Sequence, residues 1–147
     1  MERPVFQPLH RPIMRELMTV LLRHQPTTAP TPAVIALHYD WLMENPRDPD
    51  GPLLCWRVME PTDQWATRRE LDLVKIGDHR RIYLEFEGEL TGGRGRVHRV
   101  DQGTLRVNRW SESGGLLRVR LNDFEGAIEL RRHEGERWIL RIGTGAA

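Results

Sequence analysis

Apolar residues and arginines alternate with a period of two along the second half of the chain. The pattern is clear in the runs GRVHRV, TLRVNRW, LLRVRL and AIELRR, and it recurs in RWILRI. In LLRVRL, for example, Leu117, Val119 and Leu121 alternate with Arg118 and Arg120. Successive side chains of a β-strand point to opposite faces of a sheet, so this pattern predicts strands with one face in a core and the other in water.

Turn-like tripeptides separate these runs. They are DQG at 101–103, SGG at 113–115 and HEG at 133–135, and they contain residues that tight turns favour. Successive antiparallel strands at this spacing predict a meander or a small barrel. We therefore expect a mainly β fold, a compact small β-barrel of antiparallel strands with one or two short helices.

The first half of the chain is less regular. Prolines at every fourth position predict that residues 1–17 form an extended or poorly ordered N-terminal segment. The stretch 15–24 fits a helix and a buried strand equally well. Residues 33–44 (AVIALHYDWLME) are a strand candidate, residues 45–52 form a turn before the apolar run LLCWRVM, and residues 62–70 are candidates for a short helix.

Composition limits the class of protein. A length of 147 residues corresponds to about one domain, which we expect to span residues 18–147. The net charge of +1 provides no strong field that would draw the whole protein to nucleic acid or to a membrane. Cys55 is the single cysteine, so no internal disulfide can form. No apolar run approaches the ~20 residues of a membrane span. We expect a cytoplasmic monomer that does not associate with membranes.

Arginine accounts for nearly all of the positive charge. Of the 22 basic residues, only Lys75 is a lysine. A GC-rich genome favours arginine codons and explains this bias without any function. The alternative is that the planar guanidinium groups bind phosphate in bidentate fashion.

The tripeptide His38-Tyr39-Asp40 is a candidate metal motif. On a strand, His38 and Asp40 point to the same face while Tyr39 turns away. An imidazole and a carboxylate in this arrangement can chelate one divalent ion, and the ligand mix suits manganese, zinc or iron. Taken alone, the motif is also that of a surface pair at a strand end.

A second constellation lies in DHRRIYLEFEG, residues 78–88. His79 and Tyr83 can each donate a hydrogen bond to a phosphate oxygen, with Arg80 or Arg81 adding positive charge. A charged turn before a strand is the simpler interpretation. The glycine-rich TGGRGR that follows does not have the spacing of a nucleotide-hydrolase phosphate loop, and a hairpin loop that carries arginines is the expected role.

The order of these segments resembles that of the 3′-phosphoesterase domain of bacterial DNA ligase D. HYDWLME, LLCWRVME, DHRRIYLEFEG, TGGRGRVHRVDQGTL and RWILRI occur in series. In that family, a His-Tyr-Asp strand, a Trp strand, an Asp-His…Tyr…Phe-Glu-Gly segment, a Gly-rich turn and a Trp-Asp-x-Gly-Thr hairpin follow in the same order. The resemblance covers about residues 18–142, and the length is similar to that of short, stand-alone bacterial homologues.

The resemblance implies specific roles. His38 and Asp40 match two ligands of a divalent metal, which is manganese in the expectation drawn from the family, and His24 is the candidate for the third. His79 and Tyr83, four residues apart as in the family, match the pair that contacts the scissile phosphate. The arginines that we expect to assist at the phosphate are Arg81, Arg94 and Arg96.

Two family cations are missing from the chain. The arginine expected two residues after the metal aspartate is Leu42, and the lysine expected after the Trp strand falls near Glu60. Removing such donors from a phosphate site lowers transition-state stabilisation.

We therefore hold two functional hypotheses. The first is a metal-dependent 3′-phosphoesterase that removes a 3′-phosphate or 3′-ribonucleotide from DNA ends during end joining, beside a DNA ligase or polymerase. The alternative is a weakened or inactive module of the same fold that binds DNA ends or a repair partner. A structural β domain without this chemistry is a third possibility.

Overall fold

The computed structural model of the protein describes residues 15–25 and 38–143, which form a mainly β structure. The strands are β1 (Leu17–Gln25), β2 (His38–Asn45), β3 (Asp48–Val58), β4 (Glu70–His79), β5 (Gly88–Glu89), β6 (Arg96–Ser111), β7 (Gly114–Leu121), β8 (Glu125–Glu134) and β9 (Arg137–Ile142). The short helices are η1 (Thr62–Gln64), α1 (Trp65–Arg68), η2 (Arg81–Leu84) and η3 (Thr91–Gly93). None of these helices is long and apolar enough to cross a membrane.

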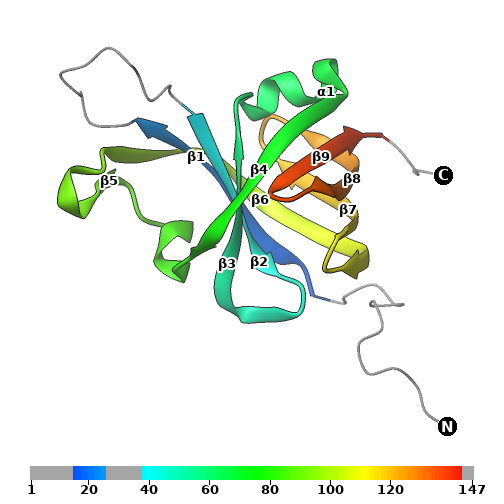
Figure 1. Ribbon diagram of the computed structural model, residues 1–147, viewed down its shortest axis with the longest axis horizontal. Coiled ribbons are helices and arrows are strands. Elements are labelled where there is room, and N and C mark those ends of the chain that lie inside the picture. Colours follow the sequence, from blue (N-terminus) through cyan, green and yellow to red (C-terminus); the bar gives the residue numbers. More distant parts are fainter. Residues whose placement is uncertain (1–14, 26–37, 144–147) are drawn as a thin grey trace, which may run out of the picture.

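Eight strands close into an antiparallel barrel (Figure 1). Their order is β1-β2-β3-β4-β9-β8-β7-β6, and β6 pairs with β1 to close the ring. The two-residue β5 adds to β6 outside this ring. The expected small β-barrel with a short helix at 62–70 is confirmed.

Two details of the predicted elements change. The stretch 15–24 becomes the strand β1, which begins at the fully buried Leu17. The turn expected at residues 101–103 is wrong, because these residues lie inside the 16-residue β6. Gly103 allows this path, since a Cβ atom there would lie 1.8 Å from the Arg120 carbonyl oxygen of the neighbouring β7.

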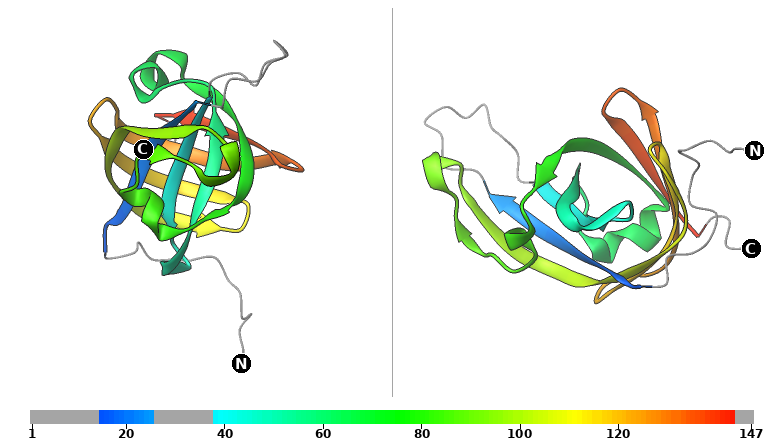
Figure 2. Two further views of the ribbon diagram at one scale, coloured as in Figure 1. Left: turned by 90° about the vertical axis from the view of Figure 1, so that its left-hand side faces the viewer. Right: turned by 90° about the horizontal axis from the view of Figure 1, so that it is seen from below.

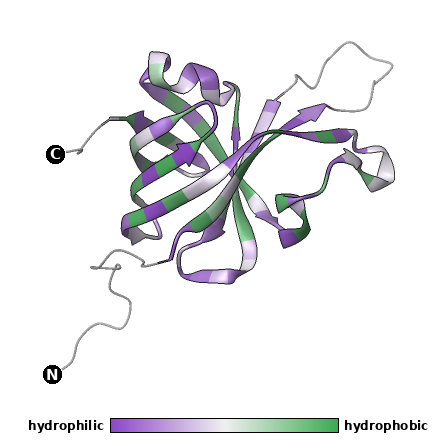
Figure 3. Cartoon of the chain, turned by 180° about the vertical axis from the view of Figure 1, so that it is seen from behind, coloured by the Kyte–Doolittle hydropathy of each residue, from purple (hydrophilic) through white to green (hydrophobic). Residues whose placement is uncertain are grey.

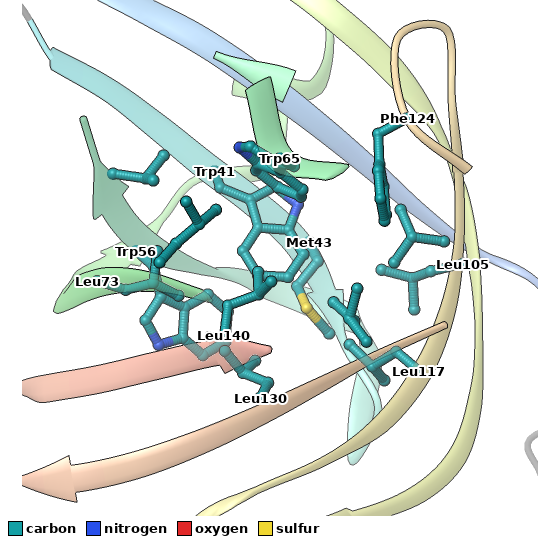
Figure 4. Close-up of a cluster of buried hydrophobic side chains, with 14 of the residues drawn as sticks. Trp41, Met43, Trp56, Trp65, Leu73, Leu105, Leu117, Phe124, Leu130 and Leu140 are labelled. Carbon is teal, nitrogen blue, oxygen red and sulfur yellow. The ribbon is translucent and has the colours of Figure 1, made fainter. Parts of the chain in front are cut away.

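The barrel interior holds a large apolar core, which we call the inner cluster. All eight barrel strands contribute to it, and Figure 3 shows the resulting alternation as green and purple bands along the strands. Aromatic rings fill its centre (Figure 4): the ring centroid of Trp41 is 5.4 Å from that of Trp56 and 5.5 Å from that of Trp65. Trp65 comes from α1, so this short helix packs into the same core.

A second, smaller core lies on the other face of β1, β2 and β3. This outer cluster consists of Val20, Leu22, Leu42, Leu53, Cys55 and Val97. Residues 80–95, which we call the cover segment, supply Tyr83, Leu84, Phe86 and Leu90 against it. The cover segment contains β5, and Figures 1 and 2 show it at the end of the structure opposite β8 and β9. The wall formed by β1–β3 is therefore buried on both faces.

A buried aspartate ties one end of the barrel together. Asp101, 2% exposed, accepts hydrogen bonds from Thr62 Oγ1 at 2.6 Å and from the backbone amides of Gln102, Asn122 and Asp123 at 2.7, 2.8 and 3.0 Å. These bonds join β6 to η1 and to the β7–β8 connection. Hydrogen bonds to an ionised acceptor contribute more than neutral ones.

Asp101→Asn tests this link. The amide NH₂ group of asparagine would face donors instead of acceptors, so we expect a loss of roughly 2–4 kcal/mol in the free energy of unfolding. Urea denaturation measures it. The matched control is Asp72→Asn, because Asp72 is exposed on β4 and its carboxylate has no hydrogen bond or ion pair among the described residues. Similar losses of unfolding free energy in Asp101→Asn and Asp72→Asn would contradict the stabilising role assigned to Asp101.

Candidate metal and phosphate site

Two histidines and an aspartate meet where β1 and β2 pair. His24 lies directly opposite His38 in the ladder. His24 Nδ1 is 3.1 Å from His38 Nε2 and 3.8 Å from Asp40 Oδ2, and His38 Nε2 is 3.5 Å from Asp40 Oδ1. One ligand atom from each residue lies within 4.8 Å of the others. The three side chains expected to bind a metal are therefore brought together.

The backbone orients the His24 ring. Its Nε2 is 2.9 Å from the Arg94 carbonyl oxygen. A carbonyl can only accept, so Nε2 carries a proton, and in the neutral ring Nδ1 presents its lone pair towards His38 and Asp40. A hydrogen bond on the far ring nitrogen is the usual support of a metal-binding histidine.

Asp40 is more buried than a strand-end carboxylate is expected to be. It is 4% exposed. Its Oδ1 has no hydrogen-bond partner among the described residues. A buried carboxylate oxygen without a hydrogen bond carries a desolvation cost that a bound cation would offset.

His79 reaches the same side of the sheet through a bulge. Leu53 of β3 pairs with His79 of β4, and Cys55 pairs with Ile76. The chain thus takes two steps along β3 but three along β4 between these pairs, so β4 contains one extra residue. An extra residue reverses the face to which the following side chains point. His79 thus joins Cys55 and Ile76 on the outer face. Asp40, Cys55 and His79 each offer one potential ligand atom, and these three atoms lie within 4.8 Å of one another.

Tyr83 lies on a helix and not on a strand. The expectation that residues 78–88 enter a strand is wrong, because His79 ends β4 and Tyr83 lies in η2. The two rings nevertheless stack edge to face with centroids 5.6 Å apart. The His79 ring is fixed from its other side, where Nδ1 donates to the Gly77 carbonyl at 2.9 Å.

These residues line one pocket of about 440 Å³ between the outer face of the barrel and the cover segment. Of the expected metal ligands and phosphate-contacting side chains, His24, Asp40, His79, Tyr83 and Arg94 line it. Three arginines line it: Arg57, Arg80 and Arg94. Apolar residues such as Leu22, Ile76 and Leu90 form the rest of the wall. The pocket therefore combines ligand atoms for a cation with cationic groups for an anion.

Arg81 does not line this pocket. Its Nη2 is 2.5 Å from the carboxylate of Glu44, which is 2% exposed, and its Nη1 donates to the carbonyls of Pro49 and Gly51 at 2.8 and 3.3 Å. Arg81 thus fastens the cover segment to β2 and β3.

Arg96 points elsewhere as well. It is exposed, 3.8 Å from the carboxylate of Glu89, and it lines a separate pocket with Arg23 and His98. Of the three arginines expected at the phosphate, the structure brings only Arg94 to the pocket.

Sequence reasoning missed Arg57. It lies directly opposite Asp40 in the β2–β3 ladder, with its Nε 4.0 Å from Asp40 Oδ1. Neither atom has a hydrogen-bond partner among the described residues. The guanidinium thus lies beside the expected metal ligands.

Cys55 lies beneath the pocket. Burial raises the pKa of its thiol well above the ordinary value of 9.0, and the nearby Asp40 carboxylate raises this pKa further. The thiol is therefore protonated at neutral pH.

Comparison with protein-family models gave no match, and comparison with curated proteins gave none either.

The raised pKa of Cys55 predicts a pH dependence of stability. The folded state holds the thiol proton more tightly than the unfolded state, so the stabilisation is complete below the unfolded pKa and is lost as the pH rises above it. We expect the free energy of unfolding to fall more steeply between about pH 8 and pH 10 in the wild-type protein than in Cys55→Ala. Denaturant titrations at several pH values measure both slopes, and equal slopes would contradict the prediction.

Proposed function

We propose that the protein is a metal-dependent phosphoesterase that acts on DNA 3′ ends and removes a 3′-phosphate or a 3′-ribonucleotide. The observation that carries the proposal is the shared pocket. Potential cation ligands from β1 and β2 face the same space as His79, Tyr83 and three arginines. A site that acts on a phosphate ester with the help of a divalent cation needs ligands for the cation and hydrogen-bond donors for the phosphate in the same space.

The ligand set fits a divalent metal. Two imidazoles and a carboxylate suit manganese, zinc or iron, and the family resemblance favours manganese. The orientation of His24 and the unpartnered Oδ1 of Asp40 support this assignment. A cation held by His24, His38 and Asp40 would supply Lewis-acid polarisation of a phosphoryl oxygen.

The other side chains of the pocket would act on the phosphate directly. Tyr83 donates its hydroxyl proton to a phosphate oxygen, and His79 donates from Nε2 in its imidazolium form. Arg57 and Arg94 supply charge-assisted donors. Such preorganised donors stabilise the charge that develops on phosphorus oxygens.

The DNA end as substrate, and a ligase or polymerase of an end-joining system as partner, rest on the family resemblance. The arginine content supports them, because guanidinium groups match phosphate geometry. The apolar wall of the pocket offers a surface for the sugar of the terminal nucleotide.

The alternative is a non-catalytic module that binds DNA ends or a repair partner. Two observations favour it. Leu42 is fully buried in the outer cluster, and the carboxylate of Glu60 pairs with Arg68 at 3.0 Å, so neither position supplies the cation of the family. Metal and DNA binding without phosphate release would select this alternative.

Asp40→Asn tests the metal ligand. The substitution keeps the shape of the buried side chain and removes its charge, so we expect manganese-dependent phosphate release from a 3′-phosphorylated oligonucleotide to fall about a hundredfold or more. The matched control is Asp78→Asn, which changes a half-exposed carboxylate of the same pocket that pairs with Lys75. Wild-type turnover in Asp40→Asn would end the metal hypothesis.

His79→Ala separates phosphate chemistry from metal binding. We expect phosphate release to fall about a hundredfold or more, which is the usual effect of removing one transition-state donor. Manganese affinity, measured by calorimetry, should change little. His98→Ala is the control, because His98 is exposed and lies outside the pocket. Loss of metal binding in His79→Ala would contradict the assigned role.

A further inference from the structure

Asp40, Cys55 and His79 form a second group of potential ligands beside the first. They come from three neighbouring strands, β2, β3 and β4, and one ligand atom from each lies within 4.8 Å of the others. Asp40 belongs to both groups. The phosphate chemistry described above gives no role to Cys55.

We propose that this group is a second cation site, selective for a thiophilic divalent ion such as zinc or cadmium, and that its occupation withdraws His79 from the phosphate. The inhibition rests on the proposed function, whereas the binding of the ion does not. A thiolate, an imidazole and a carboxylate are all side chains that bind zinc, and three protein ligands with one open position are the number found in catalytic zinc sites. Hard ions such as magnesium prefer oxygen ligands, so they would not compete for the sulfur.

The buried carboxylate points to a ligand at this place. Asp40 Oδ1 has no hydrogen-bond partner among the described residues, with His38 Nε2 at 3.5 Å and Arg57 Nε at 4.0 Å. Glu44, on the same face of the same strand, is fully buried too, but it has Arg81, Arg15 and the Met18 amide as partners. A cation between Asp40 and Cys55 would give Oδ1 the partner that Glu44 already has.

The bulge in β4 and the backbone prepare His79 for this role. Without the extra residue, His79 would face away from Cys55. Because Nδ1 donates to the Gly77 carbonyl, Nε2 carries the lone pair in the neutral ring. When the ion binds, the Cys55 thiol gives its proton to solvent and the sulfur forms the bond to the metal.

Arg57 is a positively charged neighbour that would oppose a cation at this site. Its Nε is buried 4.0 Å from Asp40 Oδ1 without a hydrogen-bond partner among the described residues, but the side chain as a whole is 42% exposed and can turn towards water. Its positive charge lowers the affinity of the second site. We therefore expect the thiolate site to fill after the site of His24 and His38.

Cadmium titration of the metal-free full-length chain tests the binding. Ultraviolet absorbance reports the thiolate–cadmium charge-transfer band, and calorimetry reports the stoichiometry. We expect two ions per chain in the wild-type protein, with the band growing during the second equivalent. Cys55→Ser and Cys55→Ala should each lose the band and one equivalent. His24→Ala should keep the band, and the exposed His133→Ala is the matched control that keeps both ions.

Zinc inhibition tests the consequence. In the wild-type protein, zinc should suppress manganese-dependent phosphate release, and the zinc concentration for half-inhibition should rise about tenfold or more in Cys55→Ser. Uninhibited activity should be unchanged in that variant. A titration without a thiolate band overturns the second site, whatever the activity. Equal inhibition of the wild type and Cys55→Ser overturns the regulatory role. A thiolate band in a protein that releases no phosphate supports the site and refutes the phosphoesterase.

Discussion

Strand β2 is buried on both faces, and this burial removes two carboxylates of the protein from contact with solvent. Trp41 and Met43 enter the barrel, while Asp40, Leu42 and Glu44 face the cover segment. Two carboxylates are thus desolvated on one face of one strand, and each needs compensation. Glu44 receives it from Arg81, Arg15 and a backbone amide. Asp40 receives less, since its Oδ1 has no hydrogen bond among the described residues. The chemistry that we propose follows from this difference.

The arginines around the pocket have two different roles. The role depends on whether the guanidinium group already binds a buried acceptor. Arg81 is occupied by a buried carboxylate and two carbonyls, so it holds the cover segment in place. The guanidinium groups of Arg57 and Arg80 line the pocket without a hydrogen bond among the described residues and remain available to an anion, although Arg57 Nε is 4.0 Å from the Asp40 carboxylate. A guanidinium that already satisfies buried acceptors cannot turn to a phosphate without leaving those acceptors unpaired.

Much of the fold could be predicted from sequence, because its strands alternate with a period of two and the barrel buries one face of most of them. The pairing register could not. A regular two-residue hairpin at Pro46 and Arg47 would place Asp40 opposite Leu53. In the structure, residues 49–52 of β3 have no partner in β2. This irregularity shifts the register by four residues and brings Arg57 opposite Asp40. The bulge that turns His79 to the outer face also cannot be recognised from the alternation of apolar and polar residues in the sequence. His24 was found only through the family resemblance, and its pairing with His38 depends on the β1–β2 register, which the alternation of side chains does not specify.

The cover segment lies outside the closed ring of strands. Only the two-residue β5 joins it to the barrel by ladder bonds, while the Asp101 network and the inner cluster belong to the ring itself. Opening of this segment therefore breaks the Arg81 contacts and exposes the outer cluster without disturbing the barrel. Local opening and global unfolding then have separate free energies. Access to the pocket is therefore coupled to the orientation of His24, because the Arg94 carbonyl that holds its ring belongs to the cover segment, whereas the backbone of His24, His38 and Asp40 belongs to the closed ring.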